Sequence, residues 1–89
     1  MLPAVTRLTE AQRSILVALC RPYEDARPYA TPASNQEIAS ELFLSLDAVK
    51  THLRVLFRKF GLESLPQNQK RARLAEMALE LGLAAGIER

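Results

Sequence analysis

One apolar stripe, within residues 46–60, constrains the fold of this chain most strongly. Its members recur at the spacing of one helix face over three turns: Val49, Leu53, Leu56, Phe57 and Phe60. Ser45 precedes the stripe as a helix N-cap, and Gly61 follows it where helices often end. The segment therefore predicts an amphipathic helix that must bury this stripe against other elements.

The first predicted helix covers residues 10–20. Thr9 and Gln12 form a Thr-x-x-Gln capping box ahead of it, and Pro22 ends it because proline cannot continue a helix. Cys20 is the only cysteine, so it has no partner for an internal disulfide. We expect it to be a small buried hydrophobic residue. The apolar face of this helix comprises Ala11, Ile15, Leu16 and Leu19.

Two further helices are predicted from their start signals. Residues 34–37, Ser-Asn-Gln-Glu, form a second capping box, and residues 43–45 make a tight break after the short helix that it begins. Pro66 is a favoured first-turn proline. The predicted fold class is all-α, without strands, and its four helices lie near residues 10–20, 35–42, 46–60 and 66–81.

The length and composition indicate one domain over residues 1–89. Hydrophobic residues make up 48% of the chain and charged residues 25%, which is ordinary for a globular protein. No segment has the length of a membrane span or the layout of a signal peptide, so we expect a cytoplasmic protein. Inside the domain, residues 21–34 hold three of the five prolines and predict a long loop.

The two middle helices have the pattern of a helix-turn-helix: a short helix, a three-residue turn and a longer helix. Lys50, Arg54 and Arg58 lie four residues apart on the free face of the longer helix, with Thr51 beside them. After Asp47, no acidic residue interrupts this face. Lysine and arginine donate to guanine edges and to phosphates, so the face predicts a DNA contact, with Arg58 on a phosphate. The alternative is a basic face that is only solvated.

Other polar residues near this motif suit phosphate contacts. His52 is the only histidine and has no nucleophile or second ligand at a useful spacing, so we expect no catalysis, metal or cofactor there. Ser34, Asn35 and Gln36 bring donors to a helix start, which favours anions. Simple helix capping is the equal alternative for these three residues, and a surface histidine without a role is the alternative for His52.

The fourth predicted helix carries a second stripe of small residues beside its main apolar face. Ala72, Ala75 and Leu79 widen that face enough to suit a partner or dimer surface, and a plain core face is the alternative. Residues 70–73, Lys-Arg-Ala-Arg, place cations at a helix start, where the helix dipole disfavours them. These cations either touch a DNA backbone or keep the helix start soluble.

The stretches Ser34–Ala39 and Leu42–Leu53 together resemble the LuxR/GerE-type helix-turn-helix of bacterial response regulators. The opening Leu8–Arg13 and the close Phe57–Gly61 resemble the same family, so the likeness runs from Leu8 to Leu81 apart from the loop. It implies that the residues entering the major groove are Lys50, Thr51 and Arg54. It also implies that Asn35 and His52 face phosphates, that Glu37, Ile38 and Val49 are structural, and that the fourth helix forms a dimer contact.

The chain departs from the family pattern in two places. The family usually joins its first two helices with a few residues, whereas residues 21–34 are long and include Tyr23 and Tyr29. The fourth helix is also long. In these respects the chain is similar to domains that follow forkhead-associated domains in some bacterial regulators, which leaves the dimer contact open.

The function predicted from these observations is sequence-specific binding of double-stranded DNA by a bacterial transcription regulator. The first alternative is a protein–protein interaction module that uses residues 21–34 and the fourth helix on the same fold. The second is recognition of the promoter −35 element in the manner of a sigma factor. An enzyme with a small-molecule substrate is not expected, because the chain has no glycine-rich phosphate loop or carboxylate cluster.

Overall fold

The structure is a computed structural model that describes residues 8–25 and 30–83. Those residues form the 3₁₀ helix η1 (Arg21–Asp25), no strand, and four α-helices: α2 (Glu10–Leu19), α3 (Asn35–Leu42), α4 (Leu46–Lys59) and α5 (Gln67–Glu80). The all-α prediction is confirmed, and every predicted helix boundary agrees with the structure within one residue. None of the described helices is long and apolar enough to cross a membrane.

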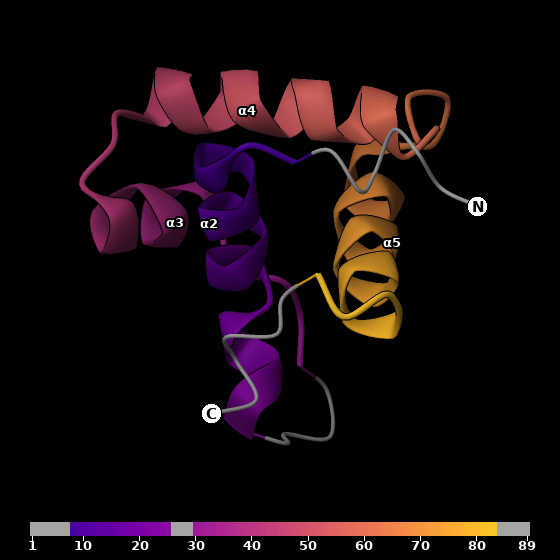
Figure 1. Cartoon of the computed structure of the whole chain (residues 1–89), viewed down its shortest axis with the longest axis horizontal. Coiled ribbons are helices and arrows are strands. Elements are labelled where there is room, and N and C mark those ends of the chain that lie inside the picture. The colour runs from indigo at the N-terminus through magenta and orange to yellow at the C-terminus, as the bar shows by residue number, and fades with distance from the viewer. Residues whose placement is uncertain (1–7, 26–29, 84–89) are drawn as a thin grey trace.

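Helix α2 is the centre of the packing. It contacts α3, α4 and α5, and in Figure 1 it runs down from α4 between α3 and α5. Each helix contributes at least one fully buried apolar side chain to a single core, and the largest of these are Ile15, Leu16, Leu19, Ile38, Leu56 and Leu74. The stripe of α4 is buried as predicted, so the opposite face of α4 is left on the surface.

The predicted helix-turn-helix is formed by α3, residues 43–45 and α4. The Ser45 Oγ accepts a hydrogen bond from the Ala48 backbone N–H at 3.0 Å, which caps α4. Phe43 ends α3 in the left-handed region, with φ 58° and ψ 44°, and its side chain is 93% exposed. Glycine is the residue that tolerates this backbone best, so the tight turn carries a steric cost at Phe43.

Replacing Phe43 with glycine is therefore expected to stabilise the domain. A non-glycine residue in the left-handed region costs of order 1–3 kcal/mol, and the greater flexibility of unfolded glycine offsets part of the gain. We expect the free energy of unfolding in urea to rise by about 1 kcal/mol. Phe43→Ala is the matched control, since it removes the same ring but keeps the strained backbone. A Phe43→Gly variant no more stable than Phe43→Ala would contradict this interpretation.

The start of α2 differs from the prediction at one position. Ala11 was expected in the core but is exposed, whereas Gln12 is buried, with 7% of its surface exposed. The Gln12 Oε1 accepts from the Thr9 backbone N–H at 3.1 Å, which completes the predicted capping box, and from the Lys59 Nζ at 2.9 Å. Both bonds satisfy the amide oxygen of Gln12. The polar side chain of Gln12, and not that of Ala11, can therefore be buried at the contact between α2 and α4.

The segment predicted as a long loop begins with a short helix. Helix η1 follows directly after α2, and Arg21 in it bonds Glu24 at 2.8 Å and Glu41 of α3 at 2.5 Å. Further along, the Ala33 backbone N–H donates to the Leu19 carbonyl at 2.9 Å. These bonds fasten both ends of the connection to the helices. Residues 26–29, with Tyr29, lie outside the described residues.

Cys20 lies in the core as predicted. Its side chain is fully buried, its Sγ donates to the Ala75 carbonyl at 3.7 Å, and burial raises the pKa of the thiol to about 11. Because only the thiolate reacts with disulfide reagents, we expect the folded protein at pH 8 to resist labelling by a thiol-specific reagent. Labelling should become fast in urea above the unfolding transition. Fast labelling of the folded chain would show that Cys20 is accessible.

Candidate nucleic-acid interface

The exposed face of α4 carries the residues that were predicted to read DNA. Lys50, Thr51 and Arg54 are all exposed, as is Arg58 one turn further along. They lie on the part of the helix surface that the buried stripe leaves exposed, so the packing that holds α4 also determines which side chains it presents. The cap at Ser45 and the turn after Lys59 limit this face to the length of α4.

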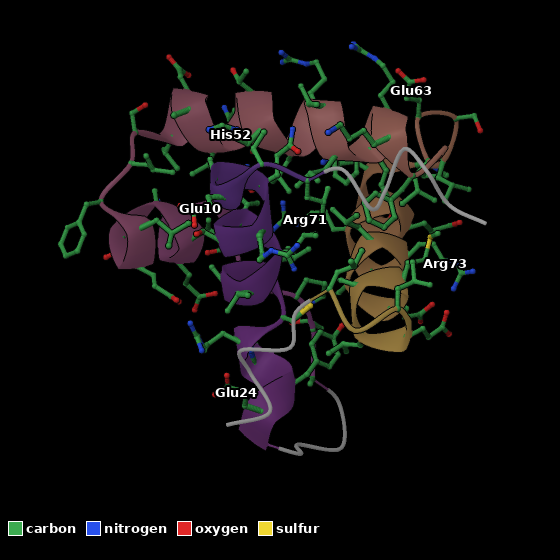
Figure 2. All side chains as sticks on the ribbon, in the orientation of Figure 1. Glu10, Glu24, His52, Glu63, Arg71 and Arg73 are labelled. Carbon is green, nitrogen blue, oxygen red and sulfur yellow. The ribbon has the colours of Figure 1, made fainter. Side chains whose placement is uncertain are left out.

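Arg58 has a partner at the end of α4. Its Nε lies 3.4 Å from the Glu63 Oε2, and both side chains are largely exposed, 63% and 60% respectively. Figure 2 shows Glu63 beside the turn that follows α4. An exposed ion pair of this kind stabilises a protein by only about 0–1 kcal/mol, so a phosphate can replace the carboxylate at little cost.

The start of α3 combines capping with surface exposure. The Ser34 Oγ accepts from the Glu37 backbone N–H at 3.1 Å, and the Glu37 Oε1 accepts from the Ser34 backbone N–H at 2.8 Å. In the structure, the Ser34 hydroxyl therefore acts as a helix cap, which is the alternative role expected for it. Gln36 is exposed, and Asn35 is half-buried and accepts a hydrogen bond from α5.

Arg71 is one of the cations at the start of α5 for which the sequence left two roles open, a DNA contact or solubility. Its Nη1 donates to the Asn35 Oδ1 at 2.6 Å and its Nη2 to the Ala33 carbonyl. Partial burial lowers the pKa of its guanidinium from the ordinary value. In Figure 2, Arg71 lies on the side of α5 that faces α2, whereas Arg73 points away from the molecule. Arg71 thus fixes α5 against the start of the helix-turn-helix.

The remaining predicted site residues lie away from the exposed basic face. His52 is half-buried on α4 and makes no hydrogen bond to another residue of the described ranges. Of the stripe on α5, Ala75 is fully buried in the domain's own core, Ala72 is half-buried and Leu79 is 40% exposed. Only Ala72 and Leu79 therefore remain available to a partner.

Helix α5 begins at Gln67, one residue later than predicted. Pro66 is its N-cap and provides no side-chain hydrogen bond.

The connection between α2 and α3 borders a surface hollow of a different character. This hollow has a volume of about 400 Å³, and the charged residues that line it within the described ranges are Arg21, Glu24, Glu37 and Glu41. Arg21 is already paired with two of these carboxylates. Among the described residues, carboxylates thus outnumber cations in this hollow, in contrast to the exposed face of α4.

A capped short helix, a three-residue turn and a longer helix with an exposed basic face define the helix-turn-helix class of DNA-binding domains. Residues 28–72 match the family model described as bacterial regulatory proteins, luxR family. The chain belongs to this family, and the resemblance found in the sequence is confirmed. The family model implies DNA as the partner and covers α3, α4 and the first turns of α5.

One similar protein is the LexA repressor of Marinobacter nauticus, which is 39% identical over 74 residues. The aligned region covers 82% of this chain but only 36% of the repressor, so the chain spans about a third of that relative's length. No solved structure matches the chain.

Proposed function

We propose that this chain binds double-stranded DNA in a sequence-specific manner, as the DNA-binding part of a bacterial transcription regulator. The observation that carries the proposal is the exposed face of α4, which has three cations and no acidic residue after Asp47. In this arrangement α4 enters the major groove and α3 crosses the backbone. The residues proposed to reach base edges are Lys50, Thr51 and Arg54.

The remaining contacts of this proposal go to phosphates. Arg58 exchanges Glu63 for a phosphate, and Gln36 and the amide nitrogen of Asn35 donate from the start of α3, beside Ser34. His52 donates to a phosphate at the edge of α4. The similarity to a repressor supports a role in regulation, exercised in the cytoplasm. Ala72 and Leu79 form the surface proposed for a second copy or another domain.

Selection from a random pool of DNA duplexes tests this proposal. We expect one motif to be enriched, and we expect the affinity for that motif to fall steeply with salt, because each neutralised phosphate adds about −0.9 to the slope of log affinity against log salt. A palindromic motif would support the dimer, and a single site would contradict it. Failure to bind any duplex at micromolar protein and low salt would refute DNA binding and favour an interaction module.

A further inference from the structure

A surface groove of about 220 Å³ lies where α4 meets the starts of α3 and α5. Its floor is apolar, formed by Leu53 and Phe57 of α4. Within the part of the chain that the structure describes, its polar lining consists of three cations and two amides, without a carboxylate: Asn35, Lys50, Arg54, Gln67 and Lys70. The groove therefore has the charge and the donors that an anion requires.

The cations of this groove differ from the others of the described chain. The structure describes every lysine and arginine except Arg7, Arg27 and Arg89. Those that bond to a protein oxygen are Arg13, Arg21, Arg58, Lys59, Arg71 and Arg73. The others, Lys50, Arg54 and Lys70, make no hydrogen bond or ion pair with a described residue, and all three line this one groove.

Lys70 is held in place without being neutralised. Its Nζ lies 5.2 Å from the centroid of the Phe57 ring, a cation–π contact that orients the amine and leaves its donors available. Gln67, one helical turn earlier, lies on the same face of α5 and lines the same groove. The first turn of α5 has no acidic residue and no side-chain cap, so the positive end of the helix dipole adds to the local charge.

We propose that this groove binds one phosphate of the DNA backbone, with Lys70 as its main contact and Gln67 as a second donor. This inference rests on the proposed function, because Lys50 and Arg54 belong both to the groove and to the exposed face of α4. It extends the interface to α5, which the helix-turn-helix alone does not include. Arg71 acts as the positioning residue, since its bonds to Asn35 and Ala33 fix the start of α5 at the groove.

The salt dependence of DNA binding tests the assignment. Fluorescence anisotropy of the selected duplex and of a scrambled duplex is measured across a salt series for the wild type, Lys70→Gln and Lys70→Arg. Arg73→Gln is the matched control, because Arg73 is a cation of the same helix that is already paired with Glu76. Circular dichroism establishes that each variant is folded.

Removing one phosphate contact lowers the magnitude of the salt slope by about 0.9, so the affinity of the variant relative to the wild type falls roughly eightfold as the salt is lowered from 1 M to 0.1 M. We expect Lys70→Gln to show this loss on both duplexes, and Lys70→Arg and Arg73→Gln to keep the wild-type slope. A Lys70→Gln variant that binds like Arg73→Gln, or that binds more weakly with an unchanged slope, would overturn the assignment while the wild type still bound DNA. A wild type that bound neither duplex would refute the proposed function itself.

Discussion

Replacing Lys50 and Arg54 together with alanine is expected to weaken binding to the preferred duplex at least about thirtyfold. Loss of one base contact costs roughly 1–3 kcal/mol, so the pair costs about 2 kcal/mol at the low end. Both side chains are exposed and make no hydrogen bond or ion pair with residues 8–25 or 30–83, so their removal should leave the fold unchanged. Anisotropy titrations at one fixed salt concentration, on the preferred and on a scrambled duplex, measure the effect.

The control for this double variant removes the same charge from other positions. Arg13→Ala with Arg73→Ala lowers the net charge equally, but Arg13 bonds the Leu83 carbonyl and Arg73 bonds Glu76, away from the groove. We expect this control to bind with nearly wild-type affinity and to keep the preference for the selected duplex. If the two double variants weakened binding equally, net charge alone would account for the affinity and α4 would have no special role.

Replacing Leu56 with alanine is expected to lower the free energy of unfolding by about 2–5 kcal/mol. Leu56 is fully buried at the middle of the α4 stripe, and truncation of such a side chain removes apolar burial and leaves a cavity. A domain of this size has a total stability of order 5–15 kcal/mol, so the loss is a large part of the whole. Urea unfolding followed by circular dichroism measures the change in midpoint.

Val55 provides the matched comparison on the same helix. It is half-buried beside Leu56 in the sequence, and alanine also favours the helical backbone. We expect Val55→Ala to cost clearly less than Leu56→Ala. Equal midpoints for the two variants would mean that α4 is not packed through the stripe that we describe, and the exposed face would then have to be reassigned.

The helices and their caps were predictable because the signals for them are local. The boxes at Thr9 and Ser34 and the cap at Ser45 each depend on residues three positions apart, and the structure contains all three. The apolar stripe of α4 likewise depends only on its own periodicity. Since burial of that stripe leaves the opposite face exposed, the surface position of Lys50 and Arg54 was also predictable from the sequence.

The contacts between distant segments were not predictable in the same way. Arg71 bonds Asn35 and Ala33 across 36 and 38 residues, and Lys59 bonds Gln12 across 47. The periodicity of apolar residues along one helix does not predict hydrogen bonds between such distant residues. Cations at the start of α5 were an available signal, because they oppose the helix dipole. That signal did not predict which role each cation has. Lys70 lines the groove, Arg71 bonds the start of α3, and Arg73 bonds Glu76.

The wide apolar face of α5 shows a related limit. Ala72, Ala75 and Leu79 share one stripe in the sequence, but packing against α2 buries Ala75 completely and leaves Leu79 40% exposed. Spacing along one helix gives the angular position of a residue and does not give the position of the neighbouring helix. The boundary between core and surface on α5 therefore depends on tertiary packing.

In the proposed complex, DNA lies along α4 and the starts of α3 and α5. The most direct test is a nuclear magnetic resonance titration of the ¹⁵N-labelled chain with the selected duplex. We predict that the largest amide shift changes fall in residues 34–36, 47–58 and 67–70, and that η1 and the second half of α5 change little. Shift changes concentrated at η1 and residues 30–33, or around Leu79, would contradict this placement of the DNA.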